Sequence, residues 1–142
     1  MKSITLLIIV LFSFFSQAQD QEIKNRIYSL LTVKGKQSPK EFPMDNDLNY
    51  IQIENGEAII NYRSRGKVTF YQGAVKNYAV TKSETGEETS FYLAPNGLGS
   101  KTINLEIFTQ ENGQYKIHLF DKLGSLDVFL VAELANKDIF KH

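Results

Sequence analysis

A strict alternation of apolar and polar residues limits this chain to a sheet-based fold more than any other feature of its sequence. The alternation is clearest around Asn55-Gly56, which Ile51 and Ile53 precede and Ala58 and Ile60 follow. Asn-Gly is the preferred pair of a two-residue type I′ turn, because both residues accept a positive φ. The pattern predicts a hairpin in which Ile53 faces Ala58 and Ile51 faces Ile60 on one apolar side.

From residue 49 onward the same two-residue period recurs between turn signals, which indicates an antiparallel meander. The hairpin of residues 50–62 supplies two strands, and six more are predicted over residues 67–71, 74–83, 88–93, 101–109, 114–120 and 125–133. Residues 20–33 fit a helix or a strand, and we favour a helical turn followed by a strand. Residues 35–48 contain two prolines and are predicted as a long connection or an edge. Residues 136–142 are predicted as a short helical or frayed tail.

These elements predict an all-β domain of eight or nine antiparallel strands, closed as an up-and-down barrel. Short hairpin links favour the barrel over the alternative, a two-layer β-sandwich, which would need longer crossovers. The chain has no Cys. Side-chain packing and the hydrogen bonds of the β-ladders must therefore hold the fold without disulfides.

The N-terminal residues predict an export signal. Lys2 supplies a positive start, an apolar run follows over residues 4–15, and Ser16-Gln17-Ala18 is a small-x-small cleavage site. The run is too short to span a bilayer, since twelve residues rise only about 18 Å as a helix, and there is no Cys to carry a lipid anchor. The sequence thus predicts a cleaved signal peptide at residues 1–18, a single β domain at residues 19–142, and a periplasmic or secreted protein.

Composition argues against several kinds of function. Sixteen Lys and Arg balance sixteen Asp and Glu, so no long-range attraction to nucleic acid is expected. Asp45-Asn46-Asp47 imitates the start of a calcium loop, but Tyr50 and Gly56 stand where that loop requires Gly and Glu. Only His118 and His142 could act as an imidazole base, and neither lies in a catalytic motif. We expect a non-catalytic protein without a metal or a cofactor.

Aromatic residues are the one feature that hints at a binding surface. The chain has 10 Phe and 7 Tyr but no Trp. Two pairs of rings are adjacent in sequence, and neighbouring residues of a strand point to opposite faces. Tyr62 stands beside the basic stretch of Arg63, Arg65 and Lys67, a mixture that suits an anionic ligand but equally a solvated hairpin turn. The candidate ligand-binding residues are Tyr62, Phe70, Tyr71, Phe91, Tyr92 and His118.

In signal, length and strand spacing the chain resembles small exported β-rich proteins of Gram-negative bacteria whose function is unknown, and it is more distantly similar to lipocalin-type barrels. The Gly-x-Trp that opens most lipocalins is absent, and Arg26-Ile27-Tyr28 stands near its place. A barrel of eight strands can enclose one small ligand. We therefore expect an exported protein that binds a small apolar or amphipathic ligand. The alternative is a cell-envelope module that holds a protein or a glycan by an exposed strand edge or a Tyr-bearing face.

Overall fold

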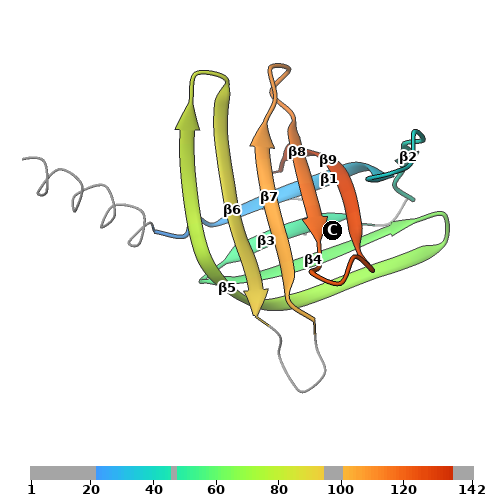
Figure 1. Ribbon diagram of the computed structural model, residues 1–142, viewed down its shortest axis with the longest axis horizontal. Coiled ribbons are helices and arrows are strands. Elements are labelled where there is room, and N and C mark those ends of the chain that lie inside the picture. Colours follow the sequence, from blue (N-terminus) through green and yellow to red (C-terminus); the bar gives the residue numbers. More distant parts are fainter. Residues whose placement is uncertain (1–21, 46–47, 95–100, 136–142) are drawn as a thin grey trace, which may run out of the picture.

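The structure is a computed structural model that describes residues 22–45, 48–94 and 101–135. These residues form one antiparallel sheet in the order β2-β1-β3-β4-β5-β6-β7-β8-β9, and β1 also pairs with β9. Within the described chain, eight strands thus close into a barrel, with β2 as an extra edge strand (Figure 1). The strands are β1 (Arg26–Gly35), β2 (Phe42–Pro43), β3 (Tyr50–Glu54), β4 (Glu57–Ser64), β5 (Lys67–Ser83), β6 (Gly86–Ala94), β7 (Ile103–Thr109), β8 (Tyr115–Phe120) and β9 (Asp127–Leu134).

The predicted barrel and its first hairpin are confirmed. Ile53 pairs with Ala58 and Ile51 pairs with Ile60, as the alternation requires. Asn55 and Gly56 have φ values of 53° and 78°, which are those of a type I′ turn. The turn chemistry and the apolar pattern therefore specify the same register, and a sandwich is not formed.

The prediction of two strands over residues 67–71 and 74–83 is wrong, because both belong to the 17-residue strand β5. The two predicted strands are separated by residues 72 and 73, but Gly73 is buried and lies against the backbone of Ala94. Glycine at this position allows two strands of the same chain to approach closely, and it does not form a turn. Figure 1 shows β5 running along the base of the barrel and then rising beside β6. A bulge between Lys76 and Ala79, with Asn77 at a φ of 54°, interrupts the pairing in the rising part.

The predicted helical turn near the N-terminus is also absent from residues 22–25, which have no regular structure, and β1 begins at Arg26. Both edges of β1 are occupied, by β3 and β2 on one side and by β9 on the other. Strand formation therefore satisfies more backbone groups than one helical turn could. The described residues of the predicted connection that follow β1 are 36–45 and 48, and the short edge strand β2 is the only strand among them. The predicted tail at residues 136–142 lies outside the described residues.

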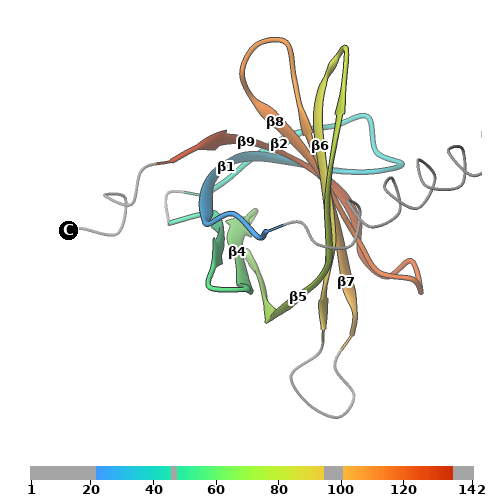
Figure 2. The ribbon, with the colours of Figure 1, turned by 90° about the vertical axis from the view of Figure 1, so that its left-hand side faces the viewer.

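Side chains fill most of the barrel interior. Figure 2 shows β5, β6 and β7 nearly edge-on, with β1 and β4 to one side of them. Tyr28 and Tyr115 meet edge to face near the start of β1, with ring centroids 5.2 Å apart, so aromatic rings pack that end of the barrel. The largest fully buried side chains are Tyr28, Ile51, Ile53, Ile60, Ile103, Leu105, Ile107, Ile117, Leu119 and Leu130. Among the described residues there is no helix long and apolar enough to cross a membrane.

Candidate functional site

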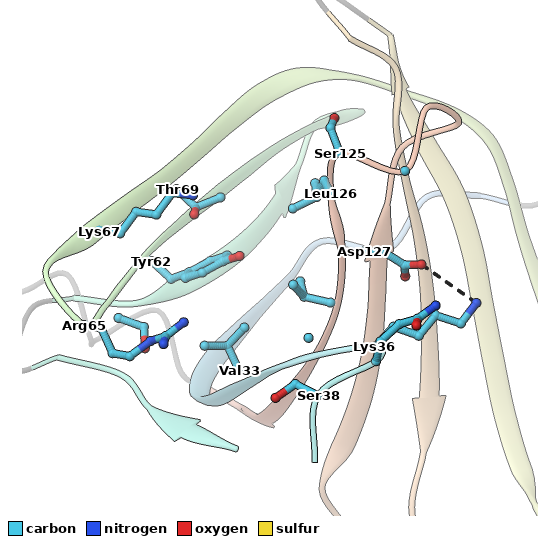
Figure 3. A pocket seen from close by; sticks show the side chains of 15 residues that line it. Val33, Lys36, Ser38, Tyr62, Arg65, Lys67, Thr69, Ser125, Leu126 and Asp127 are labelled. Atoms are coloured by element: carbon cyan, nitrogen blue, oxygen red, sulfur yellow. Dashed lines mark ion pairs between the residues drawn. The ribbon is translucent and has the colours of Figure 1, made fainter. Parts of the chain in front are cut away.

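The other end of the barrel is hollowed into a cavity of about 750 Å³, which we call the mouth cavity (Figure 3). It lies between the end of β1, the turn that joins β4 to β5, and the start of β9. Apolar, hydroxyl-bearing and charged side chains all contribute to its wall. They include Val33, Leu126 and Val128; Tyr62, Ser64, Thr69 and Ser125; and Lys36, Arg65, Lys67 and Asp127.

The cavity arises from the order of inward-facing residues on β4. Ala58, Ile60, Tyr62 and Ser64 all point inward and are buried. The first two are apolar and belong to the core, whereas the last is small and polar, so the filled interior ends at Tyr62. Tyr62 pairs with Thr69 of β5 and points into the cavity in Figure 3. A ring with a polar tip thus forms the boundary between the core and the cavity.

The turn between β4 and β5 is held by residues that precede β3. Arg65 and Gly66 have φ values of 53° and 77°, again a type I′ turn, although arginine is disfavoured at a positive φ. The carboxylate of Asp45 accepts the backbone N–H of Arg65 at 3.2 Å and that of Gly66 at 3.0 Å. The guanidinium of Arg65 lies 3.8 Å from the ring centroid of Phe42. These contacts fix one wall of the mouth cavity.

The charge at the rim is mainly positive. The ammonium of Lys36 lies 3.8 Å from a carboxylate oxygen of Asp127. The other carboxylate oxygen of Asp127 lies 2.6 Å from Nε2 of His118. The Asp127 carboxylate therefore already has two partners. Lys67 has no carboxylate partner within the described part of the chain. The rim therefore favours an anionic group, which charge-assisted hydrogen bonds to Lys and Arg would hold.

Buried hydroxyl and carboxyl groups lie close to this cavity. Burial raises the pKa of the Tyr62 phenol, although a hydrogen bond with Thr69 opposes the shift. Burial and the charge of Asp121 raise the pKa of Tyr71. A hydrogen bond from the Ser125 hydroxyl is the largest of the causes that lower the pKa of Asp121. The cavity wall thus contains one neutral phenol at neutral pH, that of Tyr62, and its residue Ser125 donates a hydrogen bond to the ionised carboxylate of Asp121.

Of the six candidate residues predicted from the sequence, Tyr62 lies in the wall of the mouth cavity. Tyr71 and Phe91 point inward, and Phe91 is a core residue that packs on Tyr78 with ring centroids 6.0 Å apart. Phe70 is 54% exposed on the outside. Tyr92 pairs with Asn104 on the outer face, where His118 also lies. Each adjacent aromatic pair has one ring on each side of the sheet, but the six residues do not form one surface.

His118 is part of a polar cluster on the outer face of β7, β8 and β9. Its Nδ1 lies 3.1 Å from Glu106 and its Nε2 lies 2.6 Å from Asp127. Its ring stacks on Phe120 and Phe129, with centroids 4.3 Å and 4.7 Å away. Both ring nitrogens face a carboxylate, so this arrangement joins the outer faces of three strands. The described residues include no group of three or more acidic, His or Cys side chains placed to hold a metal ion.

Sequence reasoning noted the rim residues Arg65 and Lys67 beside Tyr62 but did not find Lys36 or Ser125. Lys36 and Ser125 are far apart in sequence, and closure of the barrel between β1 and β9 brings their regions together. Neither residue lies in a motif, so no local signal marks them. No family model matches the sequence, and no curated protein is detectably similar to it.

Proposed function

We propose that this chain is an exported, non-catalytic barrel that binds a small amphipathic ligand in the mouth cavity. The observation that carries the proposal is a cavity with an apolar wall and a cationic rim at one end of an otherwise filled barrel. The apolar part of the ligand lies against Val33, Leu126 and Val128. Its anionic head lies near Lys67 and Arg65, within reach of the hydroxyl groups of the wall.

The filled interior limits the size of this ligand. Ile60, Ile117 and Leu130, which lie below the cavity, are 0% exposed, so an extended chain cannot pass into the barrel. A volume of about 750 Å³ lies within the range that holds drug-sized molecules. The proposed ligand is therefore compact, with a short apolar part, and differs from a long fatty acid enclosed by a hollow barrel.

Native mass spectrometry of the mature protein from its host's envelope fraction tests whether a ligand is bound. A reproducible excess mass that is lost on denaturation supports the proposal and supplies the ligand. Anilinonaphthalene sulfonate, an anionic amphipathic dye, provides a direct binding assay. We expect Lys67→Glu to weaken dye binding at least tenfold, because it places a negative charge at the rim.

Lys76→Glu is the matched control, since Lys76 is exposed on the outer face of the same strand and does not line the cavity. It should leave dye binding unchanged. The proposal fails if the protein carries no excess mass and binds no dye. It also fails if the dye binds equally to the wild type and to Lys67→Glu.

A further inference from the structure

The first half of β5 has an edge that no described strand covers. Residues Lys67 to Gly73 pair with β4 on one side, whereas the pairing with β6 begins only at Ala74, opposite Ala94. The two-residue turn makes Ser64 and Lys67 a hydrogen-bonded pair, and such pairs alternate along an antiparallel ladder. Val68, Phe70 and Gln72 therefore direct their backbone N–H and C=O groups away from β4. No described residue pairs with these groups.

This edge, which we call the β5 edge (residues 67–73), is accessible. The side chains of Val68 and Phe70 are 59% and 54% exposed on the outer face, and Gln72 is exposed beside them. The segment contains no proline, and its pairing with β4 has no bulge. Prolines and β-bulges are two features by which proteins prevent an open edge from pairing with another chain. An edge without them is a template for another strand. The occupant that fits a row of free backbone donors and acceptors is an extended strand.

We propose that a second copy of this chain occupies the β5 edge, as an antiparallel strand related by a two-fold axis at Phe70. In this register Phe70 faces Phe70 of the second copy, and Val68 faces Gln72. All three positions point their backbone groups outward, so each facing pair exchanges two hydrogen bonds. The edge is therefore complementary to itself, as a two-fold interface requires.

Side-chain chemistry agrees with the same register. Lys67 is the one charged residue of the segment, and it falls opposite Gly73 of the second copy, so no like charges meet. The two Phe70 rings are neighbours on one face of the joined sheet, where a cross-strand aromatic pair is favourable. The pairing covers the two large apolar side chains that the edge leaves in solvent. This inference goes beyond the proposed ligand binding, because the backbone groups that it uses belong to Val68, Phe70 and Gln72, and none of these three residues lines the mouth cavity.

Sedimentation of the mature protein over a wide concentration range tests the proposal. We expect a dimer that dissociates on dilution. Phe70→Lys should weaken the dimer at least tenfold, because two ammonium groups would face each other at the axis. Leu123→Lys makes the same change at a side chain that is 85% exposed in the turn between β8 and β9, and it should leave the dimer intact.

Mixing complementary variants tests the facing pair itself. Phe70→Lys and Phe70→Glu should each be monomeric, and an equal mixture should form a heterodimer, because Lys then faces Glu. Circular dichroism of each variant verifies that the barrel is folded. The proposal is overturned if the wild type is monomeric at every concentration, if Phe70→Lys dimerises like the wild type, or if the mixture does not associate. It is likewise overturned if a different polypeptide occupies the edge in the purified protein.

Discussion

A Cβ atom on Gly73 would lie 2.4 Å from the carbonyl oxygen of Ala94, a distance that real Cβ atoms do not reach. The contact marks the point at which β6 joins β5. Gly73→Ala must push the two backbones apart where both are hydrogen-bonded. We expect it to lower the free energy of unfolding by about 1–3 kcal/mol, as overpacking of a close contact does, measured by denaturant titration. Gly35→Ala is the control, because its Cβ would meet Ser38 at an ordinary 3.5 Å. Equal stability of the two variants would contradict this account.

Asp45 stabilises a turn whose sequence is otherwise unfavourable. Its carboxylate accepts two backbone N–H groups of the turn and lies 3.5 Å from Nε of Arg63. Asp45→Ala leaves Arg65 at a positive φ without this support. We expect a loss of about 1–2 kcal/mol in the free energy of unfolding, since partly exposed hydrogen bonds are worth about 1 kcal/mol each. Arg65→Asn in the Asp45→Ala background should recover part of the loss, because Asn accepts a positive φ. No recovery would show that the turn conformation is not the cause.

The hairpin of β3 and β4 and the closed meander are predictable from the sequence, because both depend on local rules. Asn55-Gly56 determines the turn, and the two-residue period determines which side chains face inward. The same rules fail at Gly73, where glycine serves a contact with Ala94, twenty-one positions away along the printed chain. They also leave residues 20–33 undecided, since the partners of β1 lie in β3 and β9.

The candidate site is less predictable than the fold for a related reason. Three of its residues, Tyr62, Arg65 and Lys67, lie close together in the sequence. This mixture of a ring and two cations predicts a surface that suits an anionic ligand. The opposite wall depends on how β1 and β9 pair across the whole chain. From the sequence alone, an aromatic residue such as Phe91 is equally consistent with a place in the core and with a binding surface. The strand register determines which face of the sheet it occupies.

His118 joins the outer faces of three strands, so its removal should destabilise the barrel. His118→Ala deletes the hydrogen bonds to Glu106 and Asp127 and the stacking on Phe120. We expect the free energy of unfolding to fall by about 1–3 kcal/mol. Part of that loss comes from leaving two carboxylates near each other without a donor between them. Glu106→Gln should therefore be less harmful in the His118→Ala background than in the wild type, and a double-mutant cycle measures the difference. Simple additivity of the two changes would exclude this coupling.

Asp121 should make the barrel sensitive to acid. The Ser125 hydroxyl, backbone N–H groups and Lys101 keep its pKa below the ordinary value of 3.8. A carboxyl group with a lowered pKa in the folded state stabilises the fold fully above pH 3.8, and this contribution is lost as the pH falls through the folded value. Stability at pH 7 and at pH 3 should therefore differ more in the wild type than in Asp121→Asn. Ser125→Ala, which removes the largest cause of the shift, should also reduce the difference. An unchanged difference in both variants would contradict the assignment.

The buried phenols should produce the opposite dependence at alkaline pH. Burial is the largest cause that raises the pKa of Tyr28, Tyr62 and Tyr71 above the ordinary value of 10.0. Their neutral forms are favoured in the folded state, so their contribution to stability is complete below pH 10.0 and is lost as the pH rises through the folded values. In ultraviolet titration of the native protein, part of the phenol absorbance change should therefore occur at a higher pH than in the denatured chain. The denatured chain, in which all 7 Tyr ionise together, is the reference.

The variant Tyr62→Phe shows which part of the absorbance change at high pH comes from the phenol at the mouth cavity. It should remove part of the absorbance change at high pH and lessen the alkaline loss of stability, because the folded state then buries one phenol fewer. Titration in the presence of anilinonaphthalene sulfonate connects this phenol to the proposed site. A bound anion beside Tyr62 disfavours the phenolate, so the dye should delay the Tyr62 ionisation further in the wild type and have no such effect in Tyr62→Phe. A delay of the same size in both proteins would show that the dye binds away from the mouth cavity.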